Sequence, residues 1–290
     1  MEAEREAITL IVTADGAVRT VSAIKDEDLF WAVRGAGANV GIVTAVEIEA
    51  APTPMVAQAV AAYQLNDPAD FLQRWGAAVE TAPDEVSAFL YLGAGAASFA
   101  QDTIVYAGDD TDAAASALRP FMRLPGLAGQ RGELTPYANV PLTTGAPHMG
   151  QQQAITHTGL AVHLDSDLAA RLAALLGGGG ADMLQIRSAG GAINDVPADA
   201  TAYAHRHQNF SVTAVAVGDR RRFDSAWEPV HELMDGMYLS FEDRPPAGTR
   251  AGGIPAAHTG TASRDQAEVG PRSPVHPELR RERVIEAAVF

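Results

Sequence analysis

Apolar and polar residues alternate with a period of two in several stretches of the chain, and such alternation predicts β-strands with one buried face. The first two stretches, residues 8–13 and 17–23, flank Ala14-Asp15-Gly16 and therefore predict a β-hairpin. The same pattern predicts strands at 42–49, 56–64, 87–92, 103–106, 156–164, 183–188 and 210–217, with shorter extended pieces at 133–140 and 201–206.

Between these strands the apolar residues recur every three to four positions, which is the spacing of an amphipathic helix. Helices are expected at 68–79, 109–119, 166–176 and 221–234, together with a short helix that begins at Asp28. Asn66 or Asp67 suits the N-cap of the first of these, and the glycine run 177–180 suits a helix end. Strands and helices follow no uniform βαβ rhythm, so we predict an α+β fold: an antiparallel sheet with helices on one face.

Proline residues and a late change in composition divide the chain into three parts. Pro52 and Pro54 mark a boundary, so residues 1–53 and 54–243 are expected to form separate domains. Residues 143–153 are polar and contain glycine, which favours a loop. From Arg244 the sequence is rich in Pro, Gly and Ala and loses its periodicity, so residues 244–290 are expected to lack a packed structure.

Composition excludes several classes of function. Lys and Arg number 21 and Asp and Glu number 36, which gives a net charge of −15 and argues against nucleic acid as a partner. The chain has no Cys, so disulfides and thiolate chemistry are excluded. No apolar run reaches the roughly 20 residues of a membrane span. We therefore expect a soluble, cytoplasmic protein without a membrane partner, whose oligomeric state the sequence leaves open.

Three glycines interrupt the pattern between the short helix at Asp28 and the strand at 42–49. Gly35, Gly37 and Gly41 fall within seven residues, which marks a loop with special backbone geometry. On the following strand, the more apolar face is expected to be the core face; it carries Ile42, Thr44, Val46 and Ile48. A dinucleotide-binding fingerprint would need a strand before the glycines and a helix after them, and the order here is the reverse.

Residues 28–44 resemble a segment of the FAD-linked oxidases of the berberine-bridge-enzyme type, within the vanillyl-alcohol-oxidase superfamily. That family carries a pattern such as D-L-F-W-A-L-R-G-G-G-G-N-F-G-I-V-T; here Ala36, Ala38 and Val40 replace two glycines and an aromatic residue. The resemblance implies FAD as the cofactor and an oxidoreductase that transfers hydride from a CH–OH or similar donor to flavin. The residues that would meet the cofactor are Gly35, Gly37, Asn39, Gly41 and Val43.

The same resemblance gives the domains their expected identities. Residues 1–53 would be the C-terminal part of the FAD-binding domain, and residues 54–243 would be the substrate domain, whose sheet covers the flavin in the family. The family's diphosphate-binding loop and its flavin-linked histidine have no counterpart in this sequence. The alternative is a non-catalytic fragment, or a module that binds a small molecule without FAD.

A second segment, residues 190–206, resembles the family pattern G-G-A-I-x-x-V-x-x-x-x-T-A-F-x-H-R. The resemblance implies substrate contacts from Tyr203, His205 and Arg206. If residues 201–206 form a strand, Thr201, Tyr203 and His205 share one of its faces. His205 and His207 would also form a pair of potential metal ligands, but no third ligand has matching spacing, so no metal is predicted. An ion pair with a carboxylate at the domain boundary is the alternative role for Arg206.

Residues 237–241 resemble the family pattern Y-x-N-[FY]. Tyr238 is therefore the candidate catalytic phenol, and Ser240 stands where the family usually has Asn. A tyrosine near the reacting carbon can accept a proton during hydride transfer if its pKa falls below the usual value of about 10. The alternative is a tyrosine in the core.

The tail at 244–290 has a specific interpretation at the level of the gene. With permitted codons, a one-nucleotide shift turns residues 252–277 into a sequence that contains K-W-D-P-D-R-L-F, which resembles the ending expected in the family. We therefore interpret the tail as either disordered or the product of a shifted reading frame. The substrate is expected to be a small molecule, which the sequence does not identify further.

Overall fold

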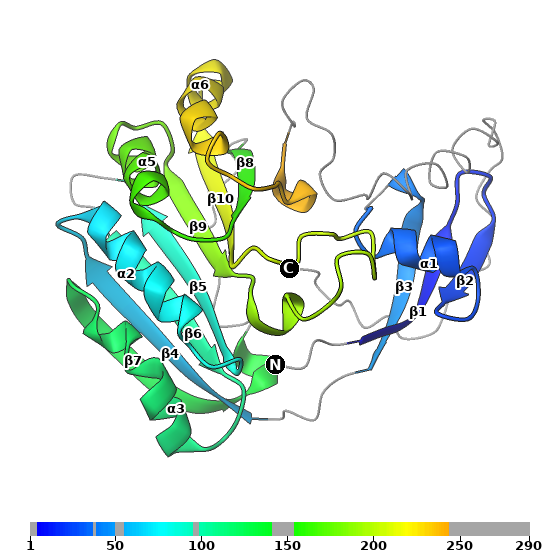
Figure 1. Cartoon of the computed structure of the whole chain (residues 1–290), viewed down its shortest axis with the longest axis horizontal. Helices are drawn as coiled ribbons and strands as arrows, with labels where there is room; N and C mark the ends of the chain where they lie inside the picture. The colour runs from blue at the N-terminus through cyan, green and yellow to red at the C-terminus, as the bar shows by residue number, and fades with distance from the viewer. Residues whose placement is uncertain (1–4, 37–38, 50–54, 95–98, 141–153, 244–290) are drawn as a thin grey trace. The chain divides into compact units, whose positions relative to one another are not determined.

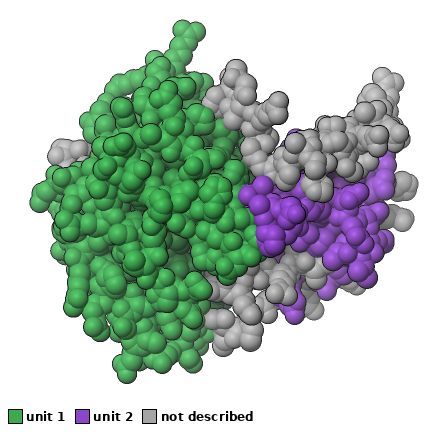
Figure 2. Space-filling view, in the orientation of Figure 1, with its two compact units in different colours: residues 1–3, 52–196, 205–252 green, residues 4–51, 197–204, 253–290 purple. Residues whose placement is uncertain are grey.

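The computed structural model describes residues 5–36, 39–49, 55–94, 99–140 and 154–243. The chain divides into two compact units (Figure 2). Unit 1 comprises residues 1–3, 52–196 and 205–252, and unit 2 comprises residues 4–51, 197–204 and 253–290. The expected loop at 143–153 and the tail at 244–290 lie outside the described residues.

Unit 2 contains a three-stranded antiparallel sheet and one short helix (Figure 1). Strands β1 (Arg5–Val12) and β2 (Val18–Ser22) form the predicted hairpin, and β3 (Ile42–Glu49) pairs with the other edge of β1. Helix α1 (Glu27–Val33) packs against β2. The small core of this unit contains Ile11, Val21 and Phe30.

Two details of unit 2 differ from the sequence prediction. Strand β3 is solvent-exposed along its whole length, so the prediction that Ile42, Val46 and their neighbours face a core was wrong for the described residues. The reason is that β3 is an edge strand, and the core under α1 lies over β1 and β2. Helix α1 also starts one residue before Asp28, and its N-cap residue Asp26 has a positive φ of 51° and provides no side-chain cap.

Unit 1 is built on a seven-stranded sheet in which all neighbouring strands are antiparallel, as predicted. The strand order is β7-β4-β6-β5-β9-β10-β8. Its strands are β4 (Met55–Gln64), β5 (Val86–Gly93), β6 (Phe99–Tyr106), β7 (Leu127–Pro136), β8 (Ala154–Ala161), β9 (Met183–Ser188) and β10 (Phe210–Val217). Strands β6 and β7 begin earlier than their sequence patterns indicated.

Helices cover one face of this sheet (Figure 1). They are α2 (Pro68–Glu80), α3 (Thr111–Leu118), α5 (Ser166–Gly177) and α6 (Arg220–His231). Each begins after an aspartate whose carboxylate accepts hydrogen bonds from main-chain N–H groups of the first turn; these are Asp67, Asp110, Asp165 and Asp219. Helix α6 ends three residues before the predicted position. None of the helices in the described ranges is long and apolar enough to cross a membrane.

The core of unit 1 lies between the helices and this face of the sheet. Trp75 of α2 and Trp227 of α6 are buried in it, and Leu184 and Ile186 of β9 point into it. The side chains that alternate with these on the strands therefore lie on the opposite face, called helix-free below because none of the described α-helices covers it. The buried carboxylate of Asp102 on β6 accepts a hydrogen bond of 2.7 Å from Nε1 of Trp75 and so ties α2 to the sheet.

One predicted extended segment is not a strand. Residues 201–206 form an irregular segment, so the expected alternation of Thr201, Tyr203 and His205 on one strand face was wrong. After α6 the chain returns to β8 and ends its described part in a 3₁₀ turn, η5 (Leu239–Phe241). The other 3₁₀ turns are η2 (Phe121–Arg123), η3 (Tyr137–Asn139) and η4 (Gly191–Ile193).

Candidate functional site

Gly35, the first of the predicted cofactor residues, packs against the chain itself. It has a φ of +139°, and a Cβ at this position would lie 2.1 Å from the main-chain nitrogen of Tyr203. This close approach is fixed by hydrogen bonds from Ala202 N to Trp31 O (3.2 Å) and from Tyr203 N to Arg34 O (3.1 Å). Gly35 therefore allows residues 197–204 to pack within unit 2, and its cofactor contact stays a prediction.

The remaining predicted cofactor residues follow along the same loop. Gly41 has a φ of +148°, and a Cβ there would lie 2.6 Å from the carbonyl oxygen of Val12. The Asn39 side chain closes the loop by donating a hydrogen bond of 2.6 Å to Ala36 O. Val43 is exposed on β3. Gly37 lies outside the described residues.

The glycine pair of the second motif borders a cavity of about 270 Å³ in unit 1. Gly191 has a φ of +62° and begins the η4 turn beside this cavity. On the same wall, Nδ2 of Asn194 donates a hydrogen bond of 3.2 Å to Oδ1 of Asn209. The first half of the motif thus shapes a turn, whereas its second half packs within unit 2 through Ala202 and Tyr203.

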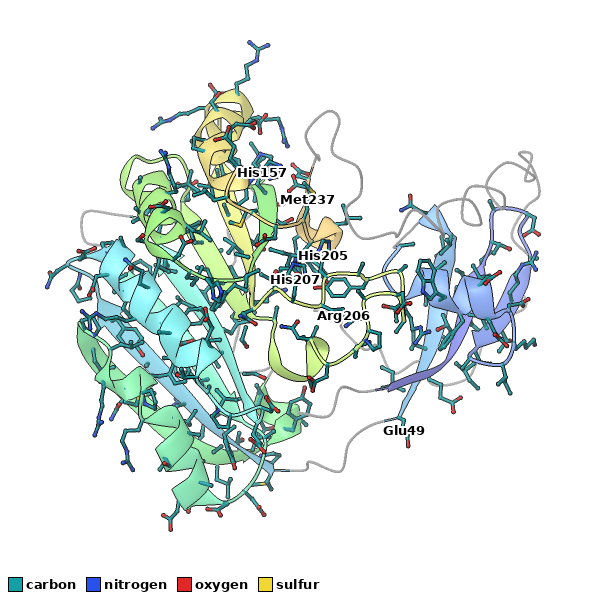
Figure 3. The ribbon with its side chains drawn as sticks, in the orientation of Figure 1. Glu49, His157, His205, Arg206, His207 and Met237 are labelled. Atoms are coloured by element: carbon teal, nitrogen blue, oxygen red, sulfur yellow. The ribbon has the colours of Figure 1, made fainter. Side chains whose placement is uncertain are left out.

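The three predicted substrate residues belong to different units. Tyr203 is part of unit 2, whereas His205 and Arg206 are part of unit 1. The imidazole of His205 lies against Gly236, where a Cβ would be 2.4 Å from Cε1, and next to Met237 (Figure 3). Nη1 of Arg206 donates a hydrogen bond of 3.3 Å to Ile193 O. Within unit 1, therefore, His205 lies beside the segment that carries Tyr238.

A polar array that the sequence analysis did not identify lies on the helix-free face of the sheet. Oε1 of Gln185 accepts a hydrogen bond of 2.9 Å from Nη2 of Arg187, and Nε2 of Gln185 donates one of 3.0 Å to the hydroxyl of Tyr91. Gln185 and Arg187 are on β9, and Tyr91 is on the adjacent strand β5. The array therefore rests on two neighbouring strands in the middle of the sheet.

Aromatic rings surround the guanidinium group of this array. Cζ of Arg187 lies 4.9 Å from the ring centroid of Phe89 and 4.5 Å from that of Phe241, both within cation–π range. Burial lowers the pKa of Arg187 below its usual value, while its charge interactions with Tyr91 and Tyr238 oppose that effect. Burial also raises the pKa of Tyr91, although Gln185 and Arg187 partly offset this. Tyr91 is therefore a neutral hydrogen-bonding group.

Tyr238, the predicted catalytic phenol, is held next to this array by β8. Its main-chain carbonyl accepts a hydrogen bond of 2.9 Å from Oγ1 of Thr158, and its N–H donates one of 3.2 Å to the same oxygen. The Tyr238 ring packs on Phe241 with centroids 5.6 Å apart. Because Phe241 also lies 4.5 Å from Cζ of Arg187, the Tyr238 ring is one aromatic contact away from the array.

A buried histidine holds the end of the same segment. His157 of β8 lies next to α6 (Figure 3), and its two ring nitrogens are each 2.8 Å from a carboxylate oxygen, Nδ1 from Glu242 and Nε2 from Asp224. Burial alone would lower the pKa of His157, but the hydrogen bonds to Glu242 and Asp224 raise it above its usual value. Since both nitrogens face acceptors, the ring is doubly protonated and joins β8, α6 and the segment after Tyr238.

The sequence contained one signal for this array. In Met-Leu-Gln-Ile-Arg-Ser, the apolar Leu184 and Ile186 alternate with the polar Gln185 and Arg187. A cation that alternates with core residues on a central strand lies on the second face of the sheet and indicates a function for that face. The partners of Arg187 come from β5 and η5, which are distant in sequence, so its surroundings could not be predicted.

Sequence comparison finds FAD-linked oxidoreductases over short segments. The chain is 68% identical to FAD-linked oxidoreductase fmqD of Aspergillus fumigatus over 34 residues, which are 12% of this chain and 7% of that protein. No protein-family model matches the chain. The local match thus supports the resemblance to FAD-linked oxidoreductases.

Structural comparison extends over most of the chain. BBE-like 1 of Physcomitrella patens superposes with a TM-score of 0.72 at 18% identity, covering 90% of this chain and 62% of that one. GilR, an oxidoreductase that catalyses the terminal step of gilvocarcin biosynthesis, was solved with pregilvocarcin; it gives a TM-score of 0.71 at 16% identity, with 91% and 68% covered. The fold is that of the berberine-bridge-enzyme-like FAD-linked oxidases. The chain therefore spans about three fifths of the first neighbour and about two thirds of the second.

The residues of unit 2 fit a flavin only in part. A glycine can make room for a cofactor only if the space where its Cβ would stand is empty. At Gly35 and Gly41 that space is already occupied by atoms of the chain itself. Asn39 and the exposed Val43 are the predicted residues that could line the edge of a flavin ring system. Among the described residues, Asn39 and Val43 are therefore the ones left to meet a flavin, and this contact stays a prediction.

Proposed function

We propose that this chain contains the substrate domain, and one edge of the flavin site, of an FAD-dependent oxidoreductase that oxidises a small molecule at a CH–OH or similar group. The observation that carries the proposal is the array of Tyr91, Gln185 and Arg187 on the helix-free face of the sheet. Support comes from the fold of the FAD-linked oxidases and the local sequence match. When bound, FAD would accept a hydride and pass its electrons on.

In this proposal the chain's own residues bind the substrate and accept its proton. Tyr91 and Arg187 donate hydrogen bonds to the substrate, and the Gln185 amide keeps both groups in position. Tyr238, as its phenolate, accepts the proton of the substrate hydroxyl and becomes a neutral phenol, which requires that its side chain be held in a fixed position. Thr158 provides that position through its two hydrogen bonds to the main chain of Tyr238. Tyr203, His205 and Arg206 remain proposed as further substrate contacts.

The alternative is a module that binds a small molecule without FAD. It is favoured by the packing of Gly35 and Gly41 against the chain itself. In this alternative the array on the sheet would still bind a ligand, but no electrons would be transferred.

Titration of the purified chain with FAD distinguishes the two functions. The oxidoreductase predicts saturable uptake that shifts the flavin absorption bands, followed by bleaching when an oxidisable ligand is added without oxygen. The Tyr238→Phe variant should keep FAD uptake and reduce the bleaching rate about 10² to 10⁴-fold. A protein that takes up no FAD would contradict the proposed cofactor. A Tyr238→Phe variant that bleaches the flavin at the full rate would contradict the role of Tyr238 as the base.

A further inference from the structure

Arg187 is a cation without a carboxylate partner among the residues that the structure describes. The ion pairs found there join other arginines and histidines to acids, and none includes Arg187. This is unexpected in a chain with a net charge of −15, in which acids outnumber basic residues. The described neighbours that contact Arg187 are an amide and aromatic rings, and none of them carries a charge that would neutralise the guanidinium.

The guanidinium group also keeps donors that the described residues leave unused. Nη2 donates to Gln185, but Nε is buried without an acceptor, and Nη1 has no acceptor in the described part of the chain. The Tyr91 hydroxyl accepts from Gln185, and its own proton likewise has no acceptor there. A half-buried cation with spare donors, next to a neutral hydroxyl donor, is the complement of an anion that accepts several hydrogen bonds.

The surroundings of Arg187 also favour an aromatic ligand. Phe89 and Tyr91 contact each other with centroids 4.9 Å apart, and Tyr238 and Phe241 form a second contacting pair. Arg187 lies within cation–π distance of a ring from each pair. These rings offer apolar area to a planar ligand, whereas an aliphatic anion would gain only the charge interaction.

We propose that Arg187 binds the carboxylate of an aromatic acid, with Tyr91 as a second donor, and that the substrate of the proposed oxidoreductase belongs to this class. The identification as substrate rests on the proposed function, but the binding site does not. Arg187 presents its spare N–H groups to the carboxylate, and Gln185 holds the guanidinium in its orientation. The aromatic pairs on either side of Arg187 pack against the ring of the ligand.

Calorimetric titration with benzoate and with benzamide tests the proposal, since the two probes have the same ring and nearly the same shape but differ in charge. We expect benzoate to bind the full chain about tenfold more tightly than benzamide, which is the gain typical of a charge-assisted hydrogen bond. Added salt should weaken benzoate alone. Arg187→Gln should bring benzoate to the level of benzamide, whereas Arg131→Gln, on the exposed edge strand β7, should change neither.

Other results would overturn the proposal. These are equal binding of the two probes, no binding of either at millimolar concentration, or an unchanged preference in Arg187→Gln. If Arg187→Gln does not fold, Arg187→Lys and Tyr91→Phe replace it, and both should keep a reduced preference for benzoate. None of these titrations requires flavin. A chain that prefers benzoate but takes up no FAD would therefore refute the oxidoreductase and leave the anion site established.

Discussion

The side-chain hydroxyl of Thr158 bonds to both main-chain polar atoms of Tyr238, donating to its carbonyl at 2.9 Å and accepting from its N–H at 3.2 Å. Thr158 is fully buried on the edge strand β8, so this oxygen replaces the pairing that another strand would provide. Oγ1 of Thr156 makes a single bond of this kind, donating to the carbonyl of Phe241 at 2.5 Å. Two threonines on one strand thus hold the segment that carries the candidate phenol.

The exchange Thr158→Val tests this attachment. Valine keeps the shape of threonine but leaves the N–H and C=O of Tyr238 without partners, so we expect a loss of about 1 to 3 kcal/mol in the free energy of unfolding. Urea denaturation measures it. Thr213→Val is the matched control, because Thr213 is also buried but no side-chain hydrogen bond of its hydroxyl is seen within the described ranges. Similar losses in both variants would show that the two hydrogen bonds contribute nothing specific.

The ionic contacts of His157 predict a pH dependence of stability. Its pKa is raised in the folded protein, so its contribution is complete below the usual histidine pKa of about 6.5 and is lost as pH rises through the folded value. The destabilisation caused by His157→Gln should therefore be largest in mild acid and should decrease with rising pH. Unfolding curves over this range test it. His163→Gln is the control, since that ring is largely exposed beside Glu80. If the difference in unfolding free energy between the wild type and His157→Gln stays constant with pH, His157 is not charged in the folded protein.

The strands of unit 1 were predictable from the sequence because each carries its own alternation. In β9, Leu184 and Ile186 define the core face, so the pattern also placed Gln185 and Arg187 on the other face. It could not show that Phe241 would meet Arg187, because that contact depends on the return of the chain after α6.

The exposed strand β3 shows what an alternating pattern cannot predict, namely whether the apolar face of a strand is buried. Its apolar positions Ile42, Val46 and Ile48 alternate regularly, yet no layer covers them in the described part of unit 2. Alternation separates the two faces of a strand but does not show whether another layer packs on either face. The packing of Gly35 against Tyr203 was equally invisible, because it joins residues far apart in the sequence.

The buried Asp102 predicts a second pH effect, in which the substitution stabilises the protein instead of destabilising it. Burial raises the pKa of Asp102 to about 7, although the hydrogen bond from Trp75 opposes this. Because the folded-state pKa is raised, the contribution of Asp102 is favourable in acid and is lost as pH rises through about 7. Asn cannot ionise, so Asp102→Asn should gain about 2 to 3 kcal/mol relative to the wild type between about pH 5 and pH 8.

Unfolding free energies of the wild type and of Asp102→Asn at several pH values provide this comparison. Asp112→Asn, an exposed aspartate in the first turn of α3, should show a nearly constant difference. A difference for Asp102→Asn that is also independent of pH would mean that this carboxyl group is ionised throughout, despite its burial.

The packing of Gly35 against residues 202–203 predicts a large effect for a single methyl group. In Gly35→Ala the new Cβ would lie 2.1 Å from Tyr203 N, and the φ of +139° is unfavourable for alanine. We expect unit 2 to lose about 2 to 4 kcal/mol. Hydrogen exchange at the amides of Ala202 and Tyr203 should become faster, because both amides bond to the chain around Gly35.

The Gly16→Ala variant is the control that separates the two effects of Gly35→Ala, the steric clash of the new Cβ and the strain of a positive φ. Gly16 also has a positive φ, +78°, but nothing lies within 4 Å of its would-be Cβ, so only the strain of about 1 kcal/mol applies. The expected result is a small loss for Gly16→Ala with unchanged exchange at Ala202 and Tyr203. If both variants lose the same stability and neither affects those amides, residues 197–204 do not pack on Gly35 in solution.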